Sequence, residues 1–231
     1  MQHISFDLET LGIDPAAMIL SIGAVKFDPE TKEIGDYFSR IIDITAPGGG
    51  GVIDASTVVW WMNQSQDARD LVFSTDPDLA GLRIPLRQAL VEFSEFIGFT
   101  DALPDGEYPD VTLWQRGDKD AQWLASAYQG MQLKTPFNYW QVKDQRTLCS
   151  LFKPFMPRRQ DDITVHDSLS DAFYQAHCLV HAFARLRETG AILTEVEQAQ
   201  AISEPVVAPS FDAGTTAAGD VRTELAAKLN E

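Results

Sequence analysis

Two carboxylates stand one residue apart near the start of the sequence, where Asp7 and Glu9 alternate with Phe6 and Leu8. In a β-strand, residues two apart share a face and lie about 6–7 Å from each other, so both carboxylates can approach a common metal ion. Sites in open α/β sheets form outside the carboxyl ends of strands, which is where this pair stands. Taken alone, the pair also fits an ordinary strand with one solvated face.

A third carboxylate, Asp120, stands near the start of a helix expected over residues 119–130. At helical spacing Asp120 shares a stripe with Leu124 and Tyr128, whereas Asp118 shares a more polar one. The stripe directs Asp120 toward the sheet, where an unpaired charge is costly and a metal ion would be a suitable partner. Asp118 is expected to face water and to be the helix N-cap.

The segment HDSLSDA places His166 five residues before Asp171, at the start of a helix expected from about 169 to 188. A histidine near a metal site can take a proton from water, because its ordinary pKa lies near pH 7. A competing interpretation is a capping box between Ser168 and Asp171. That interpretation partly excludes a metal role for Asp171, since one carboxylate would serve two partners.

Two other pairs are interpreted as structural. His177 and His181 are four residues apart on one expected helix, as on a zinc-binding face, but no third ligand accompanies them at a recognisable spacing. Cys149 and Cys178 lie in apolar helical patterns outside any CxxC pair, so both are expected to be buried and reduced.

Four carboxylates and one histidine together indicate hydrolysis of phosphodiesters with two metal ions, which activate a water and stabilise the leaving oxygen. Hard oxygen ligands favour Mg²⁺ or Mn²⁺ over zinc. The cofactor expected from these residues is therefore two Mg²⁺ or Mn²⁺ ions.

The elements that must position these groups follow an α/β pattern. Strands are expected at 3–9, 18–27, 35–42 and 111–115, and helices at 54–63, 79–98, 119–130, 144–153 and 169–188. Asp54 or Ser56 is the expected cap of the first helix. Residues 1–194 are predicted to form one domain. The small, polar and aperiodic composition further on predicts a low-complexity tail, partly disordered, over 195–231.

A formal net charge of −16 argues against a protein that coats nucleic acid by charge attraction, but not against an enzyme that grips one strand end. No apolar run approaches the roughly 20 residues needed to cross a bilayer, and no signal peptide is visible. The expected location is cytoplasmic, without a membrane partner. The sequence leaves a homodimer open.

The order and context of these motifs resemble the DEDDh 3′-5′ exonucleases, whose pattern is D-x-E on the first strand, a mid-chain Asp opening a helix and H-x(4)-D opening a late helix. The matching segments here are FDLETLG, WQRGDKDAQWL and HDSLSDA, and the resemblance spans residues 1 to about 188. The segments ILSIGAVKFDP, VVWWMNQSQDAR and DQRTL are similar to the exodeoxyribonuclease VIII-like and mycobacterial exoribonuclease-like branch, phage exonucleases included. One departure is RGDKD before the second motif, which is one residue shorter than Asn-Gly-x-x-Phe-Asp in many relatives.

The resemblance implies an RNase H-like fold, with a mixed five-stranded sheet flanked by helices. It also implies hydrolysis of DNA or RNA from the 3′ end, of a single strand or an overhang, with release of nucleoside 5′-monophosphates. The alternative is a catalytically inactive nucleic-acid-binding module with the same fold. The residues that would hold the metals by this resemblance are Asp7, Glu9, Asp120 and Asp171, with Asp7 bridging both ions, and His166 would be the general base.

Substrate contacts are expected from the residues after the D-x-E pair. By the same resemblance, Thr10, Leu11 and Gly12, which follow the first strand, would contact the terminal nucleotide, with Leu11 wedged against its base. Neighbouring helical residues point about 100° apart, so at most one of Trp60 and Trp61 should face the site. Trp61 is taken as the candidate for base stacking, against the alternative of core packing. The basic residues that could touch phosphates are Arg69, Arg116, Lys119 and Arg146.

Overall fold

The structure is a computed structural model that describes residues 2–76, 81–104, 106–159 and 166–188. Its centre is one mixed sheet of six strands in the order β4-β3-β2-β1-β5-β6. The antiparallel strands β1, β2 and β3 form a meander, and β4, β5 and β6 each pair in parallel with a neighbour. The strand bounds are β1 Gln2–Thr10, β2 Ile19–Phe27, β3 Ile34–Ile42, β4 Arg83–Ile84, β5 Val111–Gln115 and β6 Val142–Asp144.

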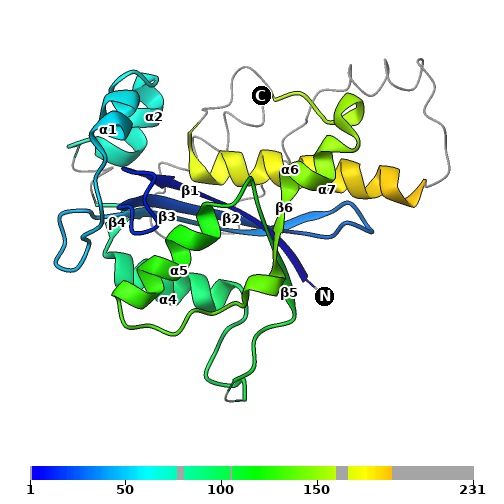
Figure 1. Cartoon of the computed structure of the whole chain (residues 1–231), viewed down its shortest axis with the longest axis horizontal. Coiled ribbons are helices and arrows are strands. Elements are labelled where there is room, and N and C mark those ends of the chain that lie inside the picture. Colours follow the sequence, from blue (N-terminus) through cyan, green and yellow to red (C-terminus); the bar gives the residue numbers. More distant parts are fainter. Residues whose placement is uncertain (1, 77–80, 105, 160–165, 189–231) are drawn as a thin grey trace.

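Helices cover both faces of this sheet (Figure 1). The helices α4 (Leu86–Phe96) and α5 (Asp120–Gly130) lie on one face, and α7 (Ser168–Arg187) crosses the other beside α6 (Gln145–Ser150). Two short helices, α1 (Ala55–Met62) and α2 (Gln66–Phe73), stand together at one end of the sheet. Two 3-10 turns, η1 (Tyr139–Gln141) and η2 (Lys153–Phe155), complete the described elements.

The expected α/β fold is confirmed, with local corrections. The sheet has six strands rather than five, because the two-residue strand β4 forms where a longer helix was expected to begin. Likewise β6 takes residues 142–144, and α6 starts only at Gln145. Both strands are too short to show a period of two in the sequence. Helix α2 was not anticipated, and the predicted tail lies outside the described residues, so the domain division stays a prediction.

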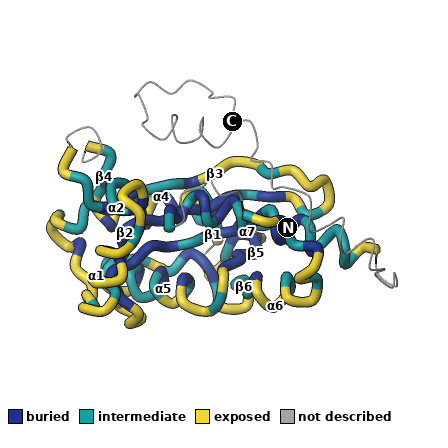
Figure 2. The backbone as a smooth tube through the Cα atoms, turned by 90° about the horizontal axis from the view of Figure 1, so that it is seen from above, coloured by how far each residue is buried: buried dark blue, intermediate teal, exposed yellow. Residues whose placement is uncertain are grey.

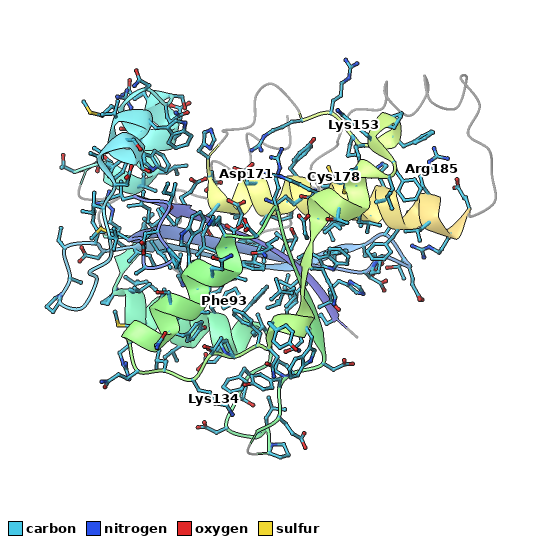
Figure 3. The ribbon with its side chains drawn as sticks, viewed as in Figure 1. Phe93, Lys134, Lys153, Asp171, Cys178 and Arg185 are labelled. Atoms are coloured by element: carbon cyan, nitrogen blue, oxygen red, sulfur yellow. The ribbon has the colours of Figure 1, made fainter. Side chains whose placement is uncertain are left out.

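Side chains from both sheet faces build the core, which forms the buried centre of the tube in Figure 2. On the α4 and α5 side, Phe6, Leu90 and Phe93 belong to one cluster of fully buried residues. On the α7 side, Val25, Trp114 and Ala176 belong to a second cluster. In Figure 3, Phe93 and Cys178 mark these two sides. A third cluster under α1 and α2 includes Leu11 and Trp61.

Gly23 sets how closely α7 approaches the sheet. A Cβ atom at this position would lie 2.3 Å from the carbonyl carbon and oxygen of Ser168, the first residue of α7. Gly23 is also the register partner of Asp7 on the neighbouring strand. The missing side chain therefore lets the start of α7 rest directly over the strands beside Asp7.

Among the described residues, no helix is both long and apolar enough to cross a membrane.

Candidate active site

The two carboxylates of β1 lie on the sheet face that α7 covers. Phe6 and Leu8 point into the opposite core, as the alternation predicts. The side-chain amide of Gln175 on α7 donates a hydrogen bond of 2.7 Å to Oδ1 of Asp7. Glu9, one residue from the strand end, is buried. Helix α7 thus covers the face that carries this pair and orients Asp7 through Gln175.

Asp120 reaches β1 from the start of α5. The register of β1 with β5 ends at the pair Ser5 and Trp114, so the later residues of β1 have no partner on that side. The Asp120 carboxylate takes the place of the missing strand, since its Oδ1 accepts the backbone N–H of Leu8 at 3.0 Å. This bond places Asp120 beside the stretch of β1 that carries Asp7 and Glu9.

The expected cap of α5 was wrong. Asp118 is exposed, as expected, but it is not the N-cap. The N-cap residue is Lys119, and its side chain makes no capping hydrogen bond. Instead, Oε1 of Gln115 at the end of β5 accepts the backbone N–H of Ala121 at 2.7 Å. The side-chain amide of Gln115 therefore satisfies one backbone N–H in the first turn of α5, and the Asp120 carboxylate bonds β1 instead.

Asp171 does not cap α7, because Asp167 does. The N-cap of α7 is Asp167, which accepts hydrogen bonds from the backbone and hydroxyl of Ser170 at 3.1 and 2.7 Å. The capping box between Ser168 and Asp171 does not form. One Asp171 oxygen instead accepts the backbone N–H of His166 at 3.2 Å, and the other pairs with Arg159.

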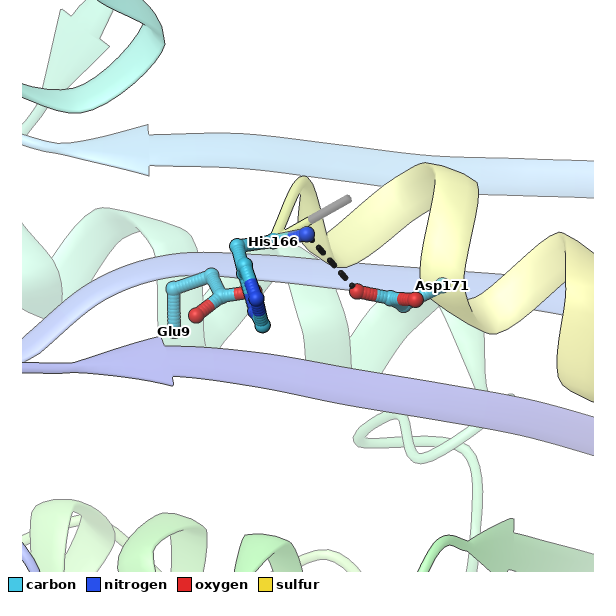
Figure 4. A group of neighbouring side chains, drawn as sticks. All are labelled: Glu9, His166 and Asp171. Carbon is cyan, nitrogen blue, oxygen red and sulfur yellow. Dashed lines mark hydrogen bonds between the residues drawn. The ribbon is translucent and has the colours of Figure 1, made fainter. Parts of the chain in front are cut away.

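Glu9, His166 and Asp171 come together as one group. Each offers a ligand atom, and these atoms lie within 4.8 Å of one another (Figure 4). Within the described residues no such group forms around His177 and His181, and the structural interpretation of that pair stays a prediction.

Burial and mutual repulsion raise the pKa values of three carboxylates at the site, Asp7, Glu9 and Asp120. Burial raises the pKa of Asp7 well above its ordinary value, and the neighbouring charges of Asp120, Asp171 and Glu9 raise it further. Burial, followed by the charge of Asp171, also raises the pKa of Glu9. Burial is again the main cause that raises the pKa of Asp120 to about 7. Buried like charges of this kind call for a cation.

The pKa of the His166 imidazole moves in the opposite direction. Burial lowers it below its ordinary value, the charge of Asp171 raises it, and the charge of Arg159 lowers it. The imidazole is therefore neutral near pH 7 and able to accept a proton. His166 also has a positive φ of 65°, a left-handed conformation that is uncommon for residues other than glycine.

The two tryptophans correct one expected substrate contact. Trp61 is 2% exposed, and its indole N–H donates to the carbonyl of Thr10 at 2.9 Å, so it is a core residue that supports the end of β1. Trp60 is 41% exposed, and its ring lies edge-to-face with His166 at a centroid distance of 4.6 Å. At this position the free aromatic surface belongs to Trp60.

The segment after β1 is tightly held. Leu11 is buried against Leu20 and Trp61, so its side chain belongs to the core rather than to an open wedge. The Thr10 hydroxyl donates to the carbonyl of Gly12 at 2.8 Å. A Cβ at Gly12 would lie 3.0 Å from the carbonyl of Val52. The contact of these residues with a nucleotide stays a prediction.

Two residues of the site, Gln175 and Arg159, were not predicted from the sequence. Gln175 stands four residues after Asp171, so helical spacing could have placed both on one face of α7. Arg159 had no such signal, because it lies outside any expected helix or strand. Of the four basic residues that could touch phosphates, Arg116, Lys119 and Arg146 are exposed, and Arg69 donates to the carbonyl of Met62. The two cysteines are free thiols, Cys178 fully buried and Cys149 partly so.

The sequence of this chain is similar to those of known exonucleases. Residues 2–183 match the family described as the 3′-5′ exoribonuclease Rv2179c-like domain. A protein of Enterobacteria phage T4 named exodeoxyribonuclease is 25% identical over 192 residues, which cover 71% of this chain and 82% of the phage protein.

The structure of one known nuclease shows the same fold. Exonuclease I of E. coli, in a zinc-bound complex with single-stranded DNA, is similar with a TM-score of 0.55 and 11% identity. The alignment covers 80% of this chain and 41% of that chain. The nuclease domain of 3′hExo, described as a DEDDh family member bound to rAMP, aligns with a TM-score of 0.49 and 16% identity over 84% of this chain and 94% of that domain.

Proposed function

Since this chain belongs to the 3′-5′ exoribonuclease Rv2179c-like domain family and is a 3′-5′ exonuclease of the DEDDh type, we propose that it removes nucleotides with two divalent ions held by Asp7, Glu9, Asp120 and Asp171. The observation that carries this proposal is that four carboxylates from one strand end and two helix starts lie close enough for the charges of Asp120, Asp171 and Glu9 to act on Asp7. Asp7 is the bridging candidate, because Asp120, Asp171 and Glu9 all act on its charge.

The donor set fits Mg²⁺ or Mn²⁺. Its members are carboxylate oxygens, the ligands that hard divalent ions prefer. The buried, mutually repelling charges around Asp7 are those that a bound cation would neutralise. When bound, two ions would supply an activated water and charge stabilisation at the leaving oxygen.

His166 is proposed as the general base. Its lowered pKa favours the neutral imidazole that can take a proton from the attacking water. The hydrogen bond from its backbone to Asp171 holds the residue next to the carboxylates. Trp60, against the His166 ring, is proposed to carry the base of a bound nucleotide in place of Trp61.

The proposed substrate is the 3′ end of a single strand or overhang, of DNA or RNA. The matching family is described as an exoribonuclease, whereas the phage relative is named an exodeoxyribonuclease. Net charge supports recognition of a strand end over neutralisation of a long duplex, because a charge of −16 repels extended nucleic acid. The proposed location remains cytoplasmic.

The test is a panel of 5′-labelled and 3′-labelled oligonucleotides, RNA and DNA, single-stranded and with 3′ overhangs. Mg²⁺ or Mn²⁺ should support release of nucleoside 5′-monophosphates, with a progressive ladder from the 5′-labelled strands, and EDTA should stop it. The matched control is Asp7→Asn, which keeps the shape of the side chain and should be inactive. Cleavage that persists in EDTA or in this variant would rule out the two-metal mechanism.

A further inference from the structure

Arg159 lies at the carboxylate group although no motif includes it. Its guanidinium forms an ion pair with Oδ1 of Asp171, and both side chains are largely buried, with exposures of 18% and 13%. The positive charge also acts on Glu9, whose pKa it lowers against the other influences. In the metal-free protein, Arg159 therefore supplies part of the cationic charge that the site requires.

Tyr174 on α7 holds Arg159 in place. Its guanidinium lies over the ring of Tyr174, 5.5 Å from the centroid. The Tyr174 hydroxyl donates to the carbonyl of Pro157 at 3.1 Å, which ties the chain just before Arg159 to the same helix. The guanidinium is thus held between an aromatic ring and the carboxylate one helical turn before it.

The charge balance of the site changes when cations bind. When all four are ionised, as metal ligands are, the carboxylates carry four negative charges, and two divalent ions would compensate all of them. Asp171 cannot give the same oxygen fully to a guanidinium and to a metal ion. Arg159 would then lose Asp171 as its ion-pair partner while remaining beside the carboxylates that are proposed to hold the metal ions.

We propose that Arg159 changes partner during the reaction cycle: it neutralises Asp171 in the metal-free protein and binds a phosphate of the substrate strand once Asp171 holds a metal ion. The inference rests on the proposed two-metal function. A guanidinium suits both partners, because its planar fork matches the oxygens of carboxylate and phosphate alike. Arg159 is in this view a substrate-positioning residue that also competes with metal binding.

The experiment uses the full chain with Arg159→Gln, which removes the charge, and Arg159→Lys, which keeps the charge but loses the fork. The matched control is Arg158→Gln, one residue earlier and exposed. Calorimetric titration with Mn²⁺ alone gives the metal Kd. Steady-state hydrolysis of a labelled oligonucleotide gives kcat and KM separately, and thermal unfolding checks the fold.

The two measurements should move in opposite directions. Without its competitor, Arg159→Gln should bind Mn²⁺ roughly three- to tenfold more tightly, since a nearby positive charge has been removed. Its KM for the oligonucleotide should rise about tenfold, as expected for loss of a charge-assisted contact to phosphate. Arg159→Lys should keep the wild-type metal affinity and show a smaller rise in KM, and Arg158→Gln should match the wild type in both.

A merely structural role would weaken metal and substrate binding together, and that result would overturn the proposal. An unchanged metal Kd or an unchanged KM in Arg159→Gln would overturn it as well. Failure of the proposed function is distinguishable, because the wild-type chain itself would then not bind Mn²⁺.

Discussion

The backbone N–H of His166 donates directly to the Asp171 carboxylate, at 3.2 Å. This bond couples the proposed base to a proposed metal ligand through the backbone, and the ligand atoms of the two side chains also lie within 4.8 Å of each other. It is made from a left-handed backbone conformation, with φ of 65° at His166. The imidazole of His166 lies near Glu9, while its backbone amide bonds Asp171 on α7. One residue therefore links the carboxylate on β1 with the carboxylate on α7.

Replacing the imidazole should impair chemistry more than metal binding. His166→Ala is expected to lower kcat on the order of 10²–10⁴-fold, the usual range for a lost general base. The backbone bond to Asp171 is retained, so the Mn²⁺ affinity measured by calorimetry should change little. A rate near wild type would remove His166 from the mechanism, and a lost metal signal would make it a ligand instead.

The neighbouring tryptophans should separate substrate binding from stability. Trp60→Ala is expected to raise the KM for an oligonucleotide by an amount equivalent to about 1–3 kcal/mol, because an exposed stacking surface is lost. Trp61→Ala should instead cost about 3–5 kcal/mol in the free energy of unfolding, as for other buried aromatics. Chemical denaturation and steady-state kinetics on both variants measure the contrast. The assignment fails if Trp61→Ala is as stable as the wild type.

Gln175 should tune the metal site through Asp7. Gln175→Leu keeps the approximate volume but removes the 2.7 Å hydrogen bond to Oδ1 of Asp7. Asp7 then loses an interaction that lowers its pKa, so it holds its proton more strongly and binds cations less well. Titration with Mn²⁺ should give an affinity roughly three- to tenfold weaker. The control is Gln129→Leu on the exposed face of α5, which should bind Mn²⁺ like the wild type.

The contact at Gly23 should link the sheet to the site. Gly23→Ala places a methyl group against the backbone of Ser168 and is expected to push the start of α7 outward. The expected cost is about 1–3 kcal/mol of stability, with weaker Mn²⁺ binding because Asp171 moves with the helix. Gly35→Ala on the next strand is the matched control, since the nearest atom there is 3.6 Å away. Equal behaviour of the two variants in thermal unfolding and metal titration would contradict this role.

Metal-free stability should fall as the pH rises. The folded pKa values of Asp7, Glu9 and Asp120 are raised, so the folded state binds protons more tightly than the unfolded chain. Their contribution to the free energy of unfolding is present below the unfolded pKa, 3.8 for Asp120, and is lost as the pH rises through the folded value, about 7. Thermal unfolding in EDTA should show this decline.

Two comparisons isolate the effect. Asp120→Asn should lose part of the slope between these pH values, because its amide does not titrate. Added Mg²⁺ should raise the Tm of the wild type most at the higher pH, where the carboxylates are charged. The same slope in the wild type and in Asp120→Asn would show that the stability change comes from other groups.

Much of the fold was predictable from local patterns. The alternation around Asp7 placed one side of β1 in the core and the other toward the site. The stripe through Asp120, Leu124 and Tyr128 identified the inward carboxylate, and all three side chains are buried. Such patterns depend on the period of a single strand or helix, which the sequence carries in full.

Most of the helices and strands, the family pattern and the residue types that can do the chemistry could therefore be read from local sequence, whereas α2, β4 and β6 could not. The tertiary structure alone decided that Asp167 caps α7, that Gln175 reaches Asp7, that Trp61 is buried and Trp60 exposed, and that Arg159 pairs with Asp171. Each of these depends on which of several equivalent donors, acceptors or faces meets a partner far away in the chain. Close packing between elements makes that choice, and no local pattern records it.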